Sequence, residues 1–350
     1  MNTDIINEKS DIRALTMAEL KDIVAECGEK GFRAGQIYSW LHDKKVESFE
    51  EMTNVPKSLI EKLQENHVIY TMSPVKILVS EIDGTRKYIQ KLIDGNVIES
   101  VLLRYDYGNT VCISSQVGCR MGCRFCASTL DGLERNLTAG EMAGQIYAIE
   151  KDISERVNHV VIMGSGEPMD NYDNFLKFIN IITSKEGANL SGRNITVSTC
   201  GIVPKIKELA EEKLAITLAL SLHAVTDEKR KEIMPIANKY SLQEVIEACN
   251  YYFDTTGRRI SLEYSLIAGK NDSDEDADGL IKIARRLKSH VNLIPVNPIK
   301  ERDYKATGNQ AVRQFKNKLE NGRVTTTVRR EMGRDINGAC GQLRRSYINE

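Results

Sequence analysis

Three cysteines, Cys119, Cys123 and Cys126, lie within eight positions of the segment SSQVGCRMGCRFCAST. Their spacing, C-x3-C-x2-C, differs from the paired knuckles of zinc sites, which close with four protein ligands. No fourth Cys or His stands nearby in a matching knuckle, and Cys112 lies seven residues upstream on an expected strand. Three thiolates suit a [4Fe–4S] cluster with one iron left free for a non-protein ligand. Flanking glycines permit the tight loop that this requires.

This spacing resembles the signature of the radical S-adenosylmethionine (SAM) superfamily, in which the amino and carboxylate groups of SAM chelate the open iron. Other segments that end expected strands fit the same superfamily, although each alone would more often cap an element or fill a core. The resemblance implies that the residues at these strand ends bind SAM. They are Gly166 and Glu167 in VIMGSGEPM, Ser198 in VSTCG, Ser221, Leu222 and His223 in LSLHA, and Asn297 in LIPVNP.

Two further cysteines indicate which family within this superfamily the chain resembles. Cys112 stands in VCISSQVGC, and Cys340 stands in the arginine-flanked segment RDINGACGQLRR. With GEPM, STCG, SLHA and FRAGQIYSWLH, these segments resemble the RlmN/Cfr family, which methylates adenine rings of RNA, over nearly the whole chain. RREMGRDINGACGQL and GEPMDNYDN are more similar to the RlmN branch, which modifies C2, than to the Cfr branch, which modifies C8. Ser165 departs from the larger residue of many relatives.

The resemblance implies a mechanism for these residues. One SAM methylates the sulfur of Cys340, and a second is cleaved at the cluster to a 5′-deoxyadenosyl radical. That radical abstracts hydrogen from the new methyl group, and the resulting carbon radical adds to the adenine. Cys112 then attacks the sulfur of Cys340, and a transient disulfide releases the product. Glu99, in VIESVLLR, matches the family's proton acceptor; an exposed strand acid is the alternative.

The same resemblance implies the partners and cofactors. We expect an S-adenosylmethionine-dependent RNA methyltransferase, with one [4Fe–4S] cluster per chain and two SAM consumed per turnover. Its substrate would be 23S rRNA, with tRNA left open as a second substrate, and its electron donor a flavodoxin or ferredoxin. The chain would be a monomer. Basic residues that could hold RNA phosphates are Arg329, Arg330, Arg334, Arg344, Arg345 and the arginine pairs at 258–259 and 285–286.

Two other classes of protein remain open from the residues alone. A different radical SAM enzyme, such as a glycyl-radical activase or an enzyme of cofactor biosynthesis, would need the cluster but not the pair Cys112 and Cys340. A non-enzymatic zinc-binding RNA protein would hold one zinc and no iron. Iron and sulfide analysis separates the second class from the rest.

The strands and helices that must position these residues are predicted by the pattern of apolar residues after about residue 110. Apolar runs such as TVCIS, HVVIMG, NITVST, AITLALSL, ISLEYSLI and VNLIPV alternate with helical stretches, and VTTTV follows as a weaker candidate. Thr138 with Glu141 and Ser241 with Glu244 form capping boxes that begin two of the helices. The alternation predicts parallel βαβ units and a partial (β/α)6 TIM-like radical SAM barrel, with ligands at the carboxyl ends of the strands. An open doubly wound sheet is the alternative.

The segments before the barrel have different patterns. Residues 16–65 show helical spacing and begin at a capping box of Thr16 and Glu19, which predicts a small helical accessory domain. Asp-Gly pairs in IDGT and IDGN separate alternating apolar runs and predict an antiparallel meander over residues 74–104. We therefore expect domains at 1–73 (RNA-binding-like), 74–108 (meander) and 109–350 (radical SAM core with the cysteine segment).

The composition of the 350 residues is that of an ordinary globular protein, 41% hydrophobic with a net charge of −1. This charge creates no global field for nucleic acid. The N-terminus lacks a signal-peptide pattern, and no run of about 18 apolar residues would span a bilayer. We expect a cytoplasmic protein with no membrane partner. In a reducing compartment its eight cysteines are better explained as ligands, catalysts or buried hydrophobes than as structural disulfides.

Overall fold

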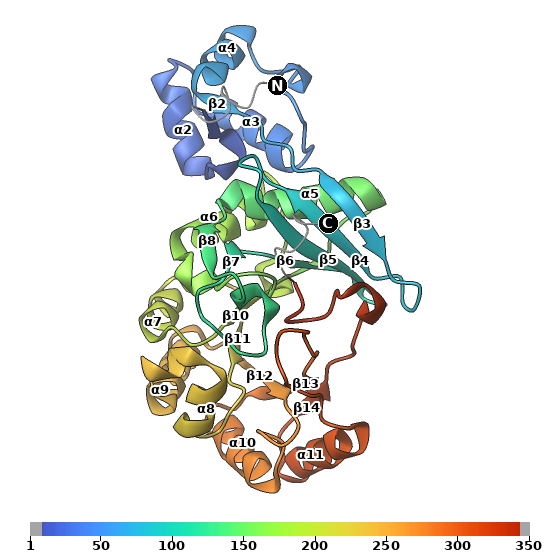
Figure 1. Ribbon diagram of the computed structural model, residues 1–350. Coiled ribbons are helices and arrows are strands. Elements are labelled where there is room, and N and C mark those ends of the chain that lie inside the picture. Colours follow the sequence, from blue (N-terminus) through green and yellow to red (C-terminus); the bar gives the residue numbers. More distant parts are fainter. Residues whose placement is uncertain (1–8, 344–350) are drawn as a thin grey trace.

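A single ten-stranded sheet forms the centre of the molecule in the computed structural model, which describes residues 9–343 (Figure 1). Its order is β14-β13-β12-β11-β10-β9-β6-β5-β4-β3. The strands are β3 (Pro74–Val79), β4 (Arg86–Lys91), β5 (Val97–Tyr105), β6 (Gly108–Ile113), β9 (His159–Ile162), β10 (Ile195–Thr199), β11 (Thr217–Ser221), β12 (Ser261–Leu266), β13 (His290–Pro295) and β14 (Thr326–Val328). Two small sheets pair β1 (Ser10–Asp11) with β2 (His67–Val68) and β7 (Gln116–Gly118) with β8 (Leu133–Asn136).

Within the ten-stranded sheet, β6 and the strands from β9 to β14 are parallel, and each pairs with the next strand of this parallel series. Helices connect them: α5 (Ala139–Ile153), α6 (Tyr172–Thr183), α7 (Val203–Glu211), α8 (Asp227–Ile233), α9 (Leu242–Thr256), α10 (Asp274–Arg286) and α11 (Asn309–Asn321). A doubly wound sheet reverses its strand order at a switch point, and this sheet does not. Since β14 and β6 lie far apart in the order, the barrel is partial, which confirms the predicted fold class.

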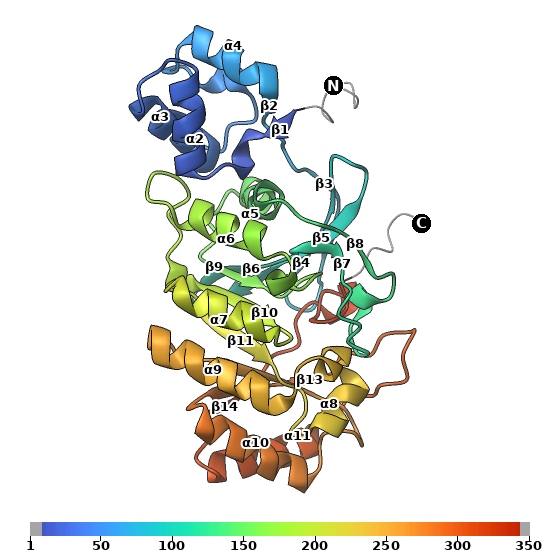
Figure 2. The ribbon, with the colours of Figure 1, turned by 90° about the vertical axis from the view of Figure 1, so that its left-hand side faces the viewer.

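Local signals in the sequence set the starts of the helices. The predicted capping boxes of Thr138 with Glu141 and of Ser241 with Glu244 are present at α5 and α9. Each satisfies two backbone N–H groups that no helical carbonyl can reach. Figure 2 shows α5, α6, α7, α9 and α10 in succession along one side of the sheet. Their apolar faces bury the main core against the strands.

The antiparallel meander is continuous with the barrel rather than a separate layer. Strands β3, β4 and β5 pair in antiparallel fashion, and β5 pairs in the same way with β6. Gly84 and Gly95 occupy the predicted hairpin loops with positive φ of 72° and 86°, which glycine adopts at little cost. Because β5 lies directly beside β6, residues of the meander can reach the barrel's ligand-binding end.

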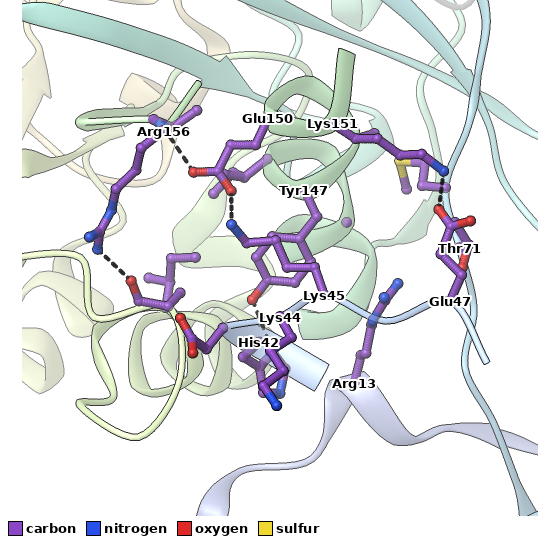
Figure 3. Close-up of a pocket in the computed structure, with 18 of the residues that line it drawn as sticks. Arg13, His42, Lys44, Lys45, Glu47, Thr71, Tyr147, Glu150, Lys151 and Arg156 are labelled. Carbon is purple, nitrogen blue, oxygen red and sulfur yellow. Dashed lines mark hydrogen bonds and ion pairs between the residues drawn. The ribbon is translucent and has the colours of Figure 1, made fainter. Parts of the chain in front are cut away.

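The N-terminal helices α2 (Met17–Glu26), α3 (Phe32–His42) and α4 (Lys57–Asn66) enclose a small core of their own. The capping box of Thr16 and Glu19 begins α2 as predicted. This unit lies against α5 (Figure 1). Tyr147 of α5 and His42 of α3 both line a cavity of about 620 Å³ (Figure 3), and the Tyr147 hydroxyl lies 3.0 Å from Nδ1 of His42.

Among residues 9–343, no helix combines the length and the apolar character that crossing a bilayer needs.

Candidate active site at the carboxyl ends of the strands

Cys119, Cys123 and Cys126 line one small cavity, of about 120 Å³, at the carboxyl ends of the parallel strands. They follow β7 in a loop that depends on Gly118, whose φ is +74°. A Cβ on Gly118 would lie 2.0 Å from the carbonyl oxygen of Gly132. Burial raises the pKa of the Cys119 thiol to about 12 and also raises the pKa of Cys123 and Cys126. Thiols in this environment need a cation before they ionise.

A multi-iron cluster suits this donor set. In the described part of the chain, no three His, Cys, Asp or Glu side chains converge as they would around one metal ion. A cluster does not require such convergence, because each of its thiolates binds a different iron. The three thiols and their glycine loop therefore fit a [4Fe–4S] group, which they would hold at this cavity.

The GEPM segment forms a second wall of the same cavity. Gly166 has a φ of +108°, and a Cβ there would lie 2.6 Å from the Ser115 hydroxyl. The Glu167 carboxylate is buried and accepts hydrogen bonds from the backbone N–H groups of Cys200 at 2.7 Å and Met169 at 3.1 Å. Burial raises its pKa, while these hydrogen bonds lower it. The carboxylate is thus fixed in place with one face toward the cavity.

Ser198, Ser221 and His223 also line this cavity. The hydroxyls of Ser198 and Ser221 lie 3.1 Å apart at the ends of adjacent strands. Nδ1 of His223 accepts the backbone N–H of Ser265 at 2.9 Å, so this nitrogen carries no proton. Burial lowers the pKa of His223 to about 3. The ring is therefore neutral, with its proton on Nε2, and can act as a hydrogen-bond donor.

Two of the expected SAM-binding residues do not line this cavity. Leu222 is fully buried, and its backbone N–H donates to Glu263. Asn297 lines a second, outer cavity of about 620 Å³. Its Nδ2 donates to the backbone carbonyl of Cys340 at 2.9 Å. Asn297 therefore holds the cysteine segment.

Cys112 and Cys340 lie on the wall of this outer cavity, and Cys340 also lines the cavity of the three cysteines. Both thiols are free. Burial and the neighbouring Cys340 raise the pKa of Cys112 to about 12, whereas Arg329 acts in the opposite direction. The C-terminal segment is held here by Met332 and Leu343, which pack against β5. Residues 228 positions apart in the chain thus share one cavity.

Arg329 lies beside the cysteine pair. It was expected among the basic residues that could hold RNA phosphates; its side chain lines both cavities, and its Nη1 lies 3.6 Å from Sδ of Met163. Burial would lower its pKa, but Cys340 and Glu263 hold the pKa above the ordinary value. Arg329 is therefore a half-buried cation in the walls that also contain Cys340.

Glu99 is buried, at 5% exposure, so the alternative of an exposed strand acid is wrong. Its carboxylate forms an ion pair of 3.2 Å with Lys87 of the neighbouring strand. Lys87 Nζ also lies 3.4 Å from the carbonyl of Asn337 in the cysteine segment. Glu99 shares a strand face with Val101, which pairs with Cys112. It thus lies beside the outer cavity.

Sequence reasoning missed several residues in the wall of the smaller cavity, among them Cys200, Glu263 and Ser265. For the last two a signal exists, because ISLEYSLI places polar side chains at alternate positions of an otherwise apolar strand. Such alternation puts them on one face. Cys200 carries no comparable signal, since a buried cysteine is usually a small hydrophobe.

The paired arginines lie at the opposite end of the strands from the thiols. Arg258 and Arg259 precede β12 and donate to the carbonyls of Ile216 and Lys288. Arg285 donates to the carbonyl of Gly322 at the end of α11. These contacts hold Arg258, Arg259 and Arg285 against neighbouring backbone carbonyls, and the interpretation that both pairs hold RNA phosphates stays a prediction. Arg344 and Arg345 lie outside the described residues.

A partial βα barrel with three thiols, a fixed carboxylate and a neutral histidine at its mouth defines the radical SAM class. In agreement, residues 113–282 match the model of the "Radical SAM superfamily", and residues 10–69 match the "Ribosomal RNA large subunit methyltransferase N-terminal domain".

Full-length comparisons give the family. The chain is 59% identical to the probable dual-specificity RNA methyltransferase RlmN of Lachnospira eligens, covering 97% of both chains. It is also 59% identical to the protein of that name from Lachnoclostridium phytofermentans, covering 99% of this chain and 97% of the relative. The crystal structure of a radical SAM methyltransferase from Sphaerobacter thermophilus matches with a TM-score of 0.90 at 40% identity, over 96% and 99% of the two chains. The chain belongs to the RlmN family.

Proposed function

We propose that the protein methylates C2 of an adenine in RNA, in the peptidyl-transferase centre of 23S rRNA and at the adenine 3′ of the anticodon in tRNA. It is an S-adenosylmethionine-dependent RNA methyltransferase with a [4Fe–4S] cluster. The observation that carries the proposal is the position of Cys340, which lines both the cavity of the three cysteines and the outer cavity with Cys112. A methyl group on its sulfur would lie between the radical source and the substrate.

The two cavities would bind different molecules. Cys119, Cys123 and Cys126 would hold the cluster, and Gly166, Glu167, Ser198, Ser221 and His223 would bind SAM, with Leu222 and Asn297 supporting this wall. When bound, the cluster supplies the electron that cleaves SAM to a carbon-centred radical. The outer cavity, at about 620 Å³, has room for an adenine extracted from its stack.

Cys340 acts as the methyl carrier. A thiolate attacks the methyl of a sulfonium far faster than a thiol does, and a neighbouring cation stabilises the thiolate. Arg329 supplies that cation. After the radical has taken one hydrogen atom from it, the methyl carbon would bond to the adenine. Cys112 would then attack the sulfur of Cys340, which breaks the bond from that sulfur to the methyl carbon, forms the transient disulfide and releases the product. Glu99, buried beside this cavity, would accept the proton from the modified carbon.

The chain would have three parts with separate roles. Residues 1–73 would form an accessory RNA-binding unit, 74–108 the meander that carries Glu99, and 109–350 the core. The chain would act as a cytoplasmic monomer, with a flavodoxin or ferredoxin as the electron donor. The helical unit carries 8 Lys and Arg against 11 Asp and Glu over residues 1–60, so shape rather than net charge would have to drive its RNA contacts.

The test uses three cysteine variants of the anaerobically reconstituted full chain, with labelled SAM and fragments of 23S rRNA. Cys340→Ala should abolish methylation while SAM cleavage persists. Cys112→Ala should trap RNA covalently on the protein, because the resolving thiol is missing. Cys27→Ala, which alters a half-buried thiol of the helical unit, should leave both activities intact.

Nucleoside mass spectrometry then gives the modified atom, since 2-methyladenosine and 8-methyladenosine are separable products. Full methylation by Cys340→Ala would contradict the proposal. Methylation at C8 would retain the mechanism and reject the site of modification.

A further inference from the structure

Arg230 is the largest side chain of the described residues that is fully buried, at 0% exposure. It lies on α8, directly after the SLHA segment, and its guanidinium reaches the ends of β10 and β11. Nη2 donates to the carbonyl of Cys200 at 2.6 Å, and Nε donates to the carbonyl of Leu222 at 3.3 Å. The guanidinium therefore lies immediately behind the wall of the thiol cavity.

The charge of Arg230 has no carboxylate partner. Among residues 9–343 no acidic side chain pairs with it within 4.0 Å, and its Nη1 is buried without a hydrogen-bond partner. Burial lowers the pKa of Arg230, and the acidic groups near enough to oppose this include Cys200, Cys123 and Asp227. A buried cation without a counter-ion is strongly destabilising. Such a group is explained by an anion that occupies the neighbouring site.

We infer that Arg230 is the internal counter-charge of the iron–sulfur cluster, and that it raises the cluster's reduction potential. The inference rests on the proposed function for the existence of the cluster. An iron–sulfur core held by three thiolates is a net anion, and reduction adds one more negative charge. A fixed cation in a low-dielectric wall stabilises the reduced form more than the oxidised form. Arg230 thus eases the electron transfer that precedes SAM cleavage.

A purely structural role is the competing explanation, because the guanidinium also clamps the carbonyls of Cys200 and Leu222. The two roles differ in what they require. A clamp depends on the forked geometry of arginine, whereas a counter-charge depends on the cation. A clamp also stabilises the protein equally with and without the cluster.

The experiment compares Arg230→Met, Arg230→Lys and the control Lys231→Met. Lys231 is adjacent on the same helix and exposed, so its replacement removes the same charge where water screens it. The reconstituted, SAM-free proteins are titrated with a low-potential reductant, and the reduced cluster is followed by electron paramagnetic resonance. Arg230→Met should shift the equilibrium at least tenfold against reduction, which is ~59 mV for one electron. Arg230→Lys and Lys231→Met should shift it less than threefold.

Unfolding of the same proteins with and without the cluster provides a second readout. Arg230→Met should reduce the stability of the loaded form more than that of the cluster-free form, in which the charge is unpaired. An unchanged potential in Arg230→Met, or equal losses of stability in both forms, would overturn the inference. Loss of the cluster in Arg230→Met alone supports it, and the same loss in Arg230→Lys contradicts it. If the unaltered protein takes up no cluster, the proposed function itself fails.

Discussion

Asn297 and Cys340 are joined by a hydrogen bond of 2.9 Å from the amide Nδ2 to the backbone carbonyl. The bond connects the loop after β13 to the segment that carries the proposed methyl carrier, 43 residues away. Cys340 is exposed, and its position between the two cavities therefore depends on a few such contacts.

Replacing Asn297 should consequently impair methyl transfer. A hydrogen bond of this kind contributes about 1 kcal/mol, so Asn297→Ala should lower the single-turnover methylation rate roughly fivefold while the iron content stays unchanged. The matched control is Asn321→Ala, which alters an exposed asparagine at the end of α11. Equal rates in the two variants would show that Asn297 does not position Cys340.

The cysteine loop should tolerate no side chain at Gly118. A Cβ there meets the carbonyl oxygen of Gly132 at 2.0 Å, and backbone cannot withdraw as a flexible side chain can. Gly118→Ala should therefore lose most of its iron after reconstitution. Gly132→Ala is the control, because its φ of +72° is similar but no atom lies within 4 Å of its Cβ. It should cost only about 1 kcal/mol of backbone strain and keep its iron. Iron and sulfide analysis of both proteins decides the prediction.

Glu167 should control SAM affinity. Its two carboxylate oxygens accept the backbone N–H groups of Met169 and Cys200, which fixes a negative charge beside the expected amino group of SAM. Glu167→Gln removes that charge, and charge-assisted hydrogen bonds contribute about 1.5–3 kcal/mol. The dissociation constant of SAM should rise at least tenfold in equilibrium binding. The exposed Asp173→Asn, on α6, should bind as the unaltered protein does. Unchanged affinity in Glu167→Gln would remove this residue from the SAM site.

The stability of the helical unit should contain two opposing pH dependences. Burial lowers the pKa of His42 to about 3, from 6.5. As pH falls below about 6.5 the unfolded chain binds a proton that the folded chain does not, so His42 makes stability fall. Burial raises the pKa of Asp11 from 3.8 to about 6. Between these two values the folded chain binds the extra proton, so Asp11 makes stability rise as pH falls.

Single substitutions should separate the two effects between pH 4 and 6. His42→Phe removes the destabilising contribution, and Asp11→Asn removes the stabilising one. As pH falls, the free energy of unfolding should decrease less in His42→Phe than in the unaltered protein and decrease more in Asp11→Asn. Each slope of this free energy against pH should differ from that of the unaltered protein by up to about 1.4 kcal/mol per pH unit. Denaturation followed by Trp40 fluorescence measures this directly, because the only tryptophan lies in α3. Identical slopes in all three proteins would contradict the prediction.

Much of the fold was predictable because its signals are local. Capping boxes such as Thr16 with Glu19 satisfy backbone groups within one helical turn, and Asp-Gly pairs at 83–84 and 94–95 act within one hairpin. The three-cysteine spacing is equally local, since it fits one loop. Strand-and-helix alternation then predicted the parallel sheet, although its continuity with the meander came only from the antiparallel pairing of β5 with β6.

The sequence by itself thus determined the elements, the cluster loop and the family to which its motifs belong. Only the tertiary structure decided that Arg329 faces the cysteine pair, that Glu99 is buried, and that Arg230 lies unpaired behind the thiols. The physical reason is distance along the chain. A side chain's burial and charge partners depend on which strands lie side by side, and no spacing within one segment encodes that register.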